Sequence, residues 1–175
     1  MTEPEIRAAY QDHKDAIYRF AWRMIGSAAA AEDIVQECFL SLLRNPRGYD
    51  AARAPLRPFL LAVARNQVRK RWRTEQRWDA VDENEFVTEP VDPTARQTTE
   101  LVAQAIQQLP PLQREALILF EYEDLSLEEI ARAVDAEVGS VKARLHRARE
   151  NLRRMLAPLR RRITGVRTHG TIERQ

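Results

Sequence analysis

Few side chains in this sequence have the types and spacing that catalysis or metal binding requires. The histidines, His13, His146 and His169, stand far apart and form no HxxxH or HExxH pattern. Asp33 and Glu37 lie four residues apart on one expected helix face. Two carboxylates without a nearby histidine are more typical of a solvated helix face than of a metal site. We therefore expect no enzyme, metal or cofactor, and keep an Asp33–Glu37 metal site as a minor alternative.

The single cysteine and the short apolar runs indicate the compartment in which the protein is expected. Cys38 permits no internal disulfide and lies on an expected inward stripe, so a buried inert thiol is favoured over a redox sensor. The longest unbroken apolar run, Phe59 to Ala64, has six residues and is too short to cross a bilayer. The acidic start lacks the pattern of a secretory signal. We expect a cytoplasmic protein.

Basic residues gather in two clusters whose chemistry suits a polyanion. The segment from Lys142 to Arg162 holds nine basic residues against one acidic residue, whereas Glu121 to Glu137 holds seven acidic residues and one arginine. The second cluster comprises Arg65, Arg69, Lys70, Arg71, Arg73 and Arg77, interleaved with Trp72 and Trp78. Basic residues beside aromatic rings suit single-stranded nucleic acid. The alternative is a solvated helix end with its tryptophans packed inward.

Helical periodicity predicts an all-α fold that positions these clusters. A first helix ends near Gly26, and Ser27 caps a second that runs to about Asn45. A third helix starts around Pro55 and continues to Trp78, with an inward face of Leu56, Phe59, Leu60 and Val63. Further helices are expected from Asp92 and Pro93 to Leu109, and from Leu112 to Asp124.

A change in composition predicts two small helical domains joined by a flexible acidic linker. Between Asp79 and Glu100 there are seven acidic residues, one arginine and prolines at positions 90 and 93. We expect domains over 1–78 and 94–162, a linker over 79–93 and a disordered tail over 163–175. At roughly 3.3 Å per residue the extended linker would span about 50 Å, more than one turn of DNA.

The last third predicts a helix-turn-helix. Ser126 and Glu129 form a capping box for a short helix, and after a break at 135–138 a longer helix carries an inward stripe that includes Val141 and Leu145. Four residues then face outward in its first turns and are candidates to read bases in the major groove: Lys142, Ala143, His146 and Arg147. Basic residues further along are expected to meet phosphates: Arg149, Arg153 and Arg154.

The helix expected over 29–44 has more apolar surface than one buried face needs. Phe39, Leu40 and Leu43 widen its stripe beside the polar residues Asp33 and Gln36. Either the helix is sandwiched between its neighbours or the extra surface docks a protein partner. The residues alone leave both readings open.

Four motifs in this order resemble a bacterial extracytoplasmic-function sigma factor. They are AEDIVQECFLSLL (31–43), PLRPFLLAVARNQVRKRWR (55–73), LPPLQREALILFEYEDLSLEEIARAV (109–134) and VGSVKARLHRARENL (138–152). The resemblance implies a dissociable subunit of core RNA polymerase that directs promoter-specific initiation and is held inactive by an anti-sigma factor. The first domain would bind core polymerase and open the minus-ten element of promoter DNA, and the second would read the minus-thirty-five element.

The resemblance also assigns roles to residues. Core polymerase would be bound by Asp33, Gln36, Glu37, Phe39 and Leu40. Minus-ten DNA would be captured by a loop and melted by the third helix, through Arg47, Tyr49, Asp50, Arg53, Arg65, Asn66, Arg69, Lys70, Trp72 and Arg73. Minus-thirty-five DNA would be contacted by Ser140, Lys142, Ala143, Arg144, His146, Arg147 and Arg149. The alternative function is a stand-alone helix-turn-helix regulator, which leaves the first domain's motifs unexplained.

The sequence departs from the family pattern at the turn of the helix-turn-helix. Asp135 and Ala136 stand where glycine and an aliphatic residue are usual, and Glu137 replaces the usual serine cap. Aspartate tolerates the left-handed backbone conformation better than most residues, so we expect the turn to survive.

Overall fold

Local start and stop signals determine most helix boundaries of this protein. The computed structural model describes residues 1–74 and 98–158, and all regular structure within these ranges is α-helical, which confirms the predicted fold class. The predicted domain boundaries, the linker and the tail lie outside the described residues. The helices are α1 (Glu3–Ile25), α2 (Ala28–Arg44), α3 (Leu56–Thr74), α4 (Thr98–Gln108), α5 (Pro111–Glu121), α6 (Leu127–Val134) and α7 (Val138–Met155).

Helices α1, α2 and α3 form the N-terminal unit. Gly26 ends α1 in the left-handed conformation, with φ of 78°, and its N–H donates to the Trp22 carbonyl at 2.7 Å. The Ser27 hydroxyl accepts a hydrogen bond from the Ala30 N–H at 3.3 Å and starts α2. Both predicted signals are confirmed.

Helices α4 to α7 form the C-terminal unit. Helix α4 ends before the predicted stop at Pro110 and Pro111, and Pro111 is the first residue of α5. Helix α5 ends before the predicted limit at Asp124 because Asp124 has a φ of 52° and the Leu125 N–H donates back to the Leu119 carbonyl at 3.1 Å. The chain therefore turns sharply between α5 and α6.

The helix-turn-helix consists of α6 and α7. The Ser126 N–H donates to Glu129 Oε2 at 2.8 Å, and the Glu129 N–H donates to Ser126 Oγ at 3.1 Å, which confirms the capping box. Asp135 ends α6 with a φ of 51°, in the left-handed conformation expected of it. Glu137 makes no side-chain capping bond at the start of α7.

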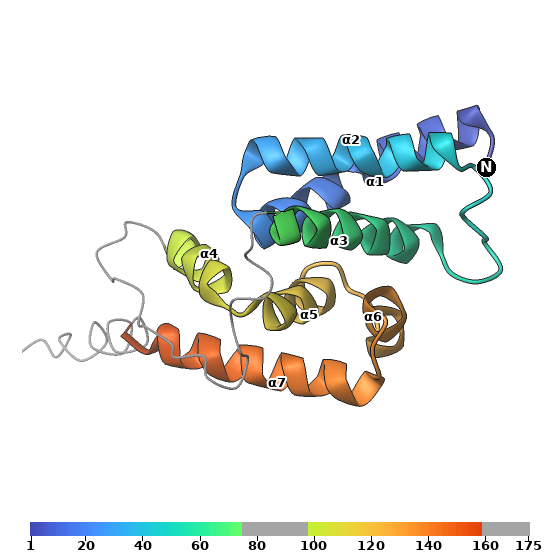
Figure 1. Ribbon diagram of the computed structural model, residues 1–175. Helices are drawn as coiled ribbons and strands as arrows, with labels where there is room; N and C mark the ends of the chain where they lie inside the picture. The colour runs from blue at the N-terminus through green and yellow to red at the C-terminus, as the bar shows by residue number, and fades with distance from the viewer. Residues whose placement is uncertain (75–97, 159–175) are drawn as a thin grey trace, which may run out of the picture.

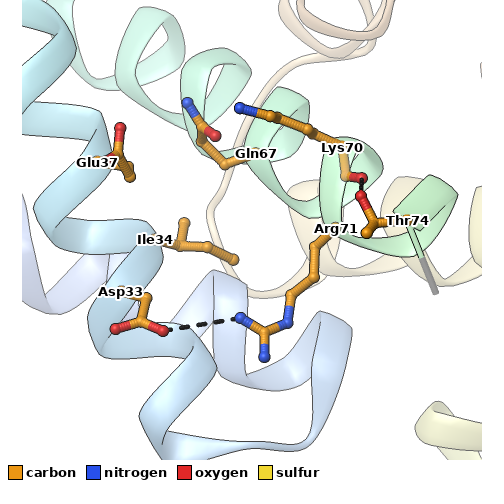
Figure 2. A pocket seen from close by; sticks show the side chains of 7 residues that line it. All are labelled: Asp33, Ile34, Glu37, Gln67, Lys70, Arg71 and Thr74. Atoms are coloured by element: carbon orange, nitrogen blue, oxygen red, sulfur yellow. Dashed lines mark hydrogen bonds and ion pairs between the residues drawn. The ribbon is translucent and has the colours of Figure 1, made fainter.

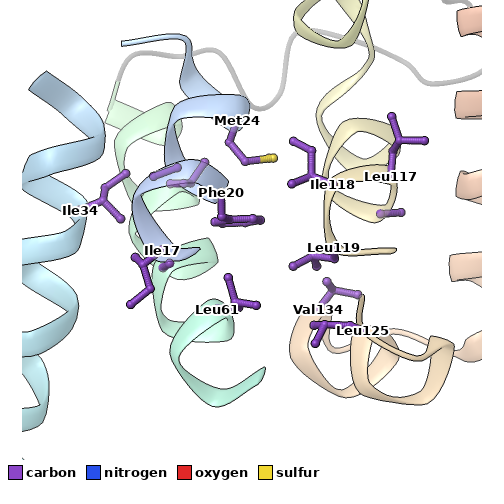
Figure 3. Packing of buried hydrophobic residues seen from close by; sticks show 14 of the residues in the cluster. Ile17, Phe20, Met24, Ile34, Leu61, Leu117, Ile118, Leu119, Leu125 and Val134 are labelled. Carbon is purple, nitrogen blue, oxygen red and sulfur yellow. The ribbon is translucent and has the colours of Figure 1, made fainter. Parts of the chain in front are cut away.

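The two units pack against each other through one shared hydrophobic core (Figure 1). Phe20 and Met24 of α1 and Leu61 of α3 face Ile118 and Leu119 of the C-terminal unit (Figure 3). Phe20, Met24 and Ile118 have no exposed surface. The N-terminal and C-terminal units thus lie face to face in one body, an arrangement that the sequence does not predict.

The predicted inward face of α3 is partly wrong. Leu56, Phe59 and Val63 are only half-buried. The buried side chains of α3 include Leu60, Leu61, Ala64 and Val68. Helix α3 packs against α1 and α2 on one side and against α6 on the other, so its buried surface is wider than a single stripe.

Candidate nucleic-acid interface

The first turns of α7 present the outward face that periodicity predicts. Val141, Leu145 and Ala148 are buried against the C-terminal unit, whereas Ser140, Lys142, Ala143 and His146 are exposed. Arg144 and Arg147 are partly exposed. This face therefore combines small, polar and basic side chains on a rigid helix, a composition that suits contact with base edges and phosphates.

Helix α7 is held in place by polar contacts as well as by its apolar stripe. The buried Asn151 donates from Nδ2 to Gln113 Oε1 at 2.8 Å, and this bond connects α7 to α5. Arg149 donates to Glu121 Oε1 from Nε at 3.1 Å and from Nη2 at 2.5 Å. Arg149 is therefore paired within the C-terminal unit, and its side chain is 44% exposed.

The loop before α3 and the exposed face of α3 form a second polar surface. Arg47, Asp50 and Arg53 are exposed in the loop, and the Tyr49 ring packs against Phe59 with centroids 5.1 Å apart. On α3, Asn66, Lys70 and Arg73 are exposed, and Arg69 is partly exposed. Burial lowers the pKa of Arg69, and the charge of Arg65 adds to this effect.

Two side chains predicted to contact minus-ten DNA, Arg65 and Trp72, are buried in this structure. Arg65 is 5% exposed, and its Nε lies 2.6 Å from Glu115 Oε1 of α5. Trp72 is 3% exposed, and the guanidinium of Arg114 lies 5.5 Å from its ring centroid. Side chains of α5 therefore lie against both residues: Glu115 against Arg65 and Arg114 against Trp72. The alternative reading of inward-packed tryptophans holds for Trp72.

Helix α2 presents the candidate polymerase surface. Asp33 and Gln36 are exposed, Leu40 is 39% exposed and Leu43 is 47% exposed. A pocket of about 360 Å³ lies between α2 and α3, and an ion pair of 3.7 Å joins Arg71 Nη1 to Asp33 Oδ2 at its edge (Figure 2). Helix α2 therefore has both an apolar and an acidic exposed face, next to the basic end of α3.

Phe39 and Cys38 belong to the interior of the N-terminal unit. Phe39 is 5% exposed and meets the Tyr10 ring edge-on at a centroid distance of 5.0 Å. Its role as a polymerase contact stays a prediction. Cys38 is fully buried, and burial raises the pKa of its thiol to about 12, with a further contribution from Glu37. A thiol in this state is protonated and unreactive, unlike a redox sensor.

The two carboxylates of the alternative metal site, Asp33 and Glu37, are each paired with an arginine. In the described ranges, no three histidine, cysteine, aspartate or glutamate side chains come together as metal ligands. Asp33 pairs with Arg71, and Glu37 pairs with Arg44 at 3.4 Å. None of the helices in residues 1–74 and 98–158 combines the length and apolar character needed to span a bilayer.

Sequence reasoning missed the buried carboxylates Glu115 and Glu123. Glu115 lies on α5 and Glu123 in the turn that follows, and both are buried. Glu115 stands among the buried apolar residues of α5, and this interruption of the stripe is a signal that periodicity could have found. Glu123 lies in a turn, where no periodicity applies.

Comparison with known proteins matches each unit to a separate family. Residues 9–78 match Sigma-70 region 2, and residues 99–152 match Sigma-70, region 4. The chain is 32% identical over 156 residues to the ECF RNA polymerase sigma factor SigE of Mycolicibacterium smegmatis, a match that covers 84% of this chain and 60% of SigE.

Two further similarities extend over most of both chains. The sigma factor RpoE, solved in complex with the anti-sigma factor NepR from Bartonella quintana, aligns with a TM-score of 0.68 and 25% identity over 87% of this chain and 97% of RpoE. The ECF RNA polymerase sigma factor SigL of Mycobacterium tuberculosis is 31% identical over 159 residues, which are 88% of this chain and 90% of SigL. With regions 2 and 4 matched in order, the chain belongs to the ECF family of RNA polymerase sigma factors, which are transcription initiation factors.

Proposed function

We propose that this sigma factor acts in the cytoplasm and directs core RNA polymerase to promoters by contacting DNA at two separate elements. The observation that carries the proposal is the exposed face of α7, where Lys142, Ala143 and His146 stand on a helix whose opposite face is buried. A recognition helix of this kind enters the major groove with its N-terminal turns. In this proposal α7 reads the minus-thirty-five element.

The N-terminal unit would contact the minus-ten element. This unit exposes five polar or cationic side chains. They are Arg47 and Arg53 of the loop and Asn66, Lys70 and Arg73 of α3. Such groups suit a displaced single strand, whose phosphates they can follow while the bases are held apart. Capture of unpaired bases would stabilise the open promoter without nucleotide hydrolysis by this chain.

Helix α2 would bind core polymerase, and an inhibitor protein would compete with polymerase for binding to this chain. Leu40 and Leu43 expose apolar surface beside Asp33 and Gln36, a composition that supports docking of a protein partner. The similar RpoE is described in complex with the anti-sigma factor NepR. By analogy, we propose that an anti-sigma factor sequesters this chain.

The decisive test is reconstitution of the full chain with bacterial core polymerase, followed by run-off transcription from the DNA upstream of its own gene. Arg147→Ala is expected to weaken promoter recognition by about 1 to 3 kcal/mol without loss of polymerase binding. Arg19→Ala is the matched control, because Arg19 is exposed on α1 and distant in sequence from the helix-turn-helix.

A second pair of variants tests the polymerase surface. Asp33→Ala combined with Gln36→Ala is expected to reduce association with core polymerase in gel filtration. Gln11→Ala with Asp12→Ala removes the same two side-chain types from an exposed part of α1 and is expected to bind normally. Absence of both association and transcripts for the unmodified chain would contradict the proposed function.

A further inference from the structure

Helix α7 buries an asparagine at a point where its apolar stripe continues. Val141, Leu145 and Ala148 belong to the buried stripe, and the next buried side chain is Asn151, which is 5% exposed. The neighbouring Leu152 is only half-buried. Apolar burial alone would turn the leucine inward and the amide toward solvent. A specific contact therefore holds α7 in its observed rotation.

The amide of Asn151 is bonded at both of its ends. Its Nδ2 donates to Gln113 Oε1 of α5 at 2.8 Å, and both side chains are buried. Its Oδ1 accepts a hydrogen bond from Arg154 Nη2 at 2.9 Å. A guanidinium can only donate, so Arg154 determines which end of the asparagine amide points outward, and the other end must meet Gln113. The bond between α5 and α7 is thus directional, unlike the apolar contacts around it.

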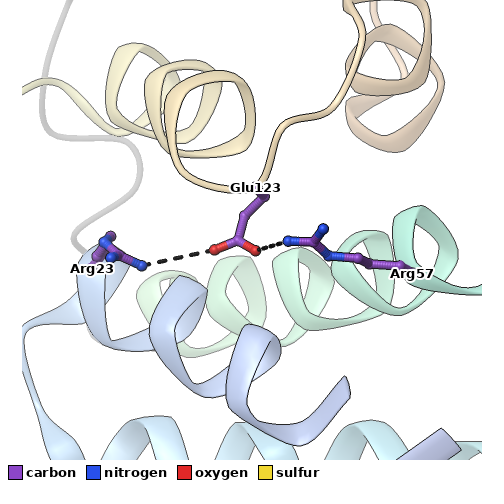
Figure 4. Close-up of polar contacts among 3 residues, drawn as sticks. All are labelled: Arg23, Arg57 and Glu123. Atoms are coloured by element: carbon purple, nitrogen blue, oxygen red, sulfur yellow. Dashed lines mark hydrogen bonds and ion pairs between the residues drawn. The ribbon is translucent and has the colours of Figure 1, made fainter. Parts of the chain in front are cut away.

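This uncharged pair differs from the buried ion pairs of the same chain. Each carboxylate oxygen of Glu123 faces an arginine: Oε2 lies 2.8 Å from Arg57 Nη2, and Oε1 lies 3.8 Å from Arg23 Nη1 (Figure 4). Gln113 has no exposed surface, and its Nε2 donates to no protein atom among the described residues. A buried amide pair of this kind adds little to stability compared with two apolar side chains. Its best-attested role is to specify one register of packed helices.

The rotation of α7 matters for DNA because a helix carries its exposed face as one rigid body. At a rise of about 1.5 Å per residue, Asn151 lies roughly 6 Å along the axis from Arg147 and roughly 13 Å from Lys142. Placing Leu152 where Asn151 stands would turn the exposed face by about 100°. Contacts to base edges depend on the exact position of donor and acceptor atoms, so a much smaller rotation already weakens them.

We propose that Gln113 and Asn151 are positioning residues for recognition of the minus-thirty-five element. Their buried bond sets the rotation of α7 on α5, so that Lys142 and Arg147 meet the base edges of this element. The same asparagine orients Arg154, which is exposed and is predicted to meet a phosphate. The inference rests on the proposed function for the role of α7. The two positioning residues are buried and act through the helix, without touching DNA themselves.

Replacing both amides by leucine separates positioning from stability. Gln113→Leu with Asn151→Leu removes the bond and both polar groups, so we expect a folded chain whose midpoint of urea denaturation is unchanged or higher. In complex with core polymerase, this variant is expected to lose about tenfold in its preference for the DNA upstream of its own gene over the same DNA with a substituted minus-thirty-five element. Filter binding of the two DNAs measures the preference. An unchanged preference in the folded variant would overturn the proposal.

Two further variants separate the hydrogen bond from the packing around it. Gln113→Asn with Asn151→Gln exchanges the amides and keeps the combined length of the pair, so it is expected to restore most of the preference. Met155→Leu changes the same buried stripe without touching the amides and is expected to keep the preference in full. An equal loss in Met155→Leu and in the double leucine variant would overturn the proposal. If circular dichroism shows that the double leucine variant is unfolded, Gln113→Met with Asn151→Leu replaces it, because methionine is closer in volume to glutamine.

A distance measurement on the chain without polymerase separates this inference from the proposed function. Spin labels at Gln104→Cys on α4 and Arg153→Cys on α7 occupy exposed positions, and the buried Cys38 does not compete for the label. Electron paramagnetic resonance is expected to give one narrow distance for the unmodified amide pair and a broader or second distance for the leucine pair. Equal distance distributions would refute the positioning role. Failure of the unmodified chain to associate with core polymerase would instead refute the proposed function.

Discussion

The two basic helices of this sigma factor, α3 and α7, differ in what covers them. Both carry several arginines, yet Arg65 on α3 is 5% exposed while Lys142 and His146 on α7 are exposed. Helix α7 buries one stripe and leaves the opposite face to solvent. Helix α3 contacts α1, α2 and α6, and α5 supplies the partner of Arg65. Charge along a helix therefore identifies a polyanion-binding candidate, while its neighbours determine whether the site is open.

The largest expected effect tests whether the two units share one core. Phe20 of α1 is fully buried against the C-terminal unit. Phe20→Ala is expected to lower the free energy of unfolding by about 3 to 5 kcal/mol, because it leaves a cavity in the shared core. Urea denaturation followed by circular dichroism measures this loss. Leu43→Ala, at a position that is 47% exposed, is the control and is expected to change stability little.

The next effect contrasts two arginines of the same helix. Arg65→Ala removes the partner of the buried Glu115, and we expect it to cost about 3 kcal/mol of stability. Arg73→Ala, on the exposed part of α3, is expected to change stability by less than about 0.5 kcal/mol. Thermal and urea denaturation of both variants give the comparison. Similar losses for the two would mean that α3 is not covered in solution.

A smaller effect concerns α7, whose outward face is exposed. Lys142→Ala on α7 is expected to weaken binding of the polymerase complex to promoter DNA and to reduce the slope of log affinity against log salt by about 1, because one positive charge that displaces counterions from the DNA is lost. Filter binding at several salt concentrations measures this slope. The stability of the chain is expected to stay unchanged, since Lys142 is exposed.

The smallest effect is a pH dependence of stability that originates from the buried Glu115, the partner of Arg65 on α3. Burial raises the pKa of Glu115 above its ordinary value of 4.5, although the charges of Arg65, Arg144 and Arg69 oppose the shift. A raised pKa means that the folded chain binds the proton more tightly than the unfolded chain does. The resulting stabilisation is complete below pH 4.5 and is lost as the pH rises through the raised pKa.

Glu115→Gln removes this titration, so the variant should gain stability relative to the parent chain as the pH rises from about 4.5 to 7. Urea denaturation of both proteins at several pH values measures the difference. A relative loss for the variant over the same range would show that Glu115 titrates in the opposite sense.

Local signals in the sequence predict the elements and the open surface well. Gly26 and Ser27 mark the end of α1 and the start of α2, and the Ser126 capping box starts α6. These features involve neighbouring residues only. The outward face of α7 is equally predictable, because one buried stripe fixes the orientation of the whole helix.

The covered surface could not be predicted in this way. Arg65 and Trp72 are buried and contact Glu115 and Arg114 of α5, which follows them by many residues in the chain. Phe39 has the spacing of a surface residue and is buried because Tyr10 of α1 packs on it. Periodicity describes how one helix divides its own surface, and it does not tell which other helix will cover the remaining part.

The turn containing Glu123 has a consequence for production of the protein. Arg23 and Arg57 precede Glu123 in the chain, so during synthesis on the ribosome the N-terminal unit can form before its partner carboxylate emerges. A fragment that begins after α3 lacks the N-terminal unit, and the apolar side chains of Ile118 and Leu119, which face Phe20, Met24 and Leu61 in this structure, lose that cover. Truncated C-terminal fragments are therefore expected to self-associate, and heterologous expression should start from the complete polypeptide.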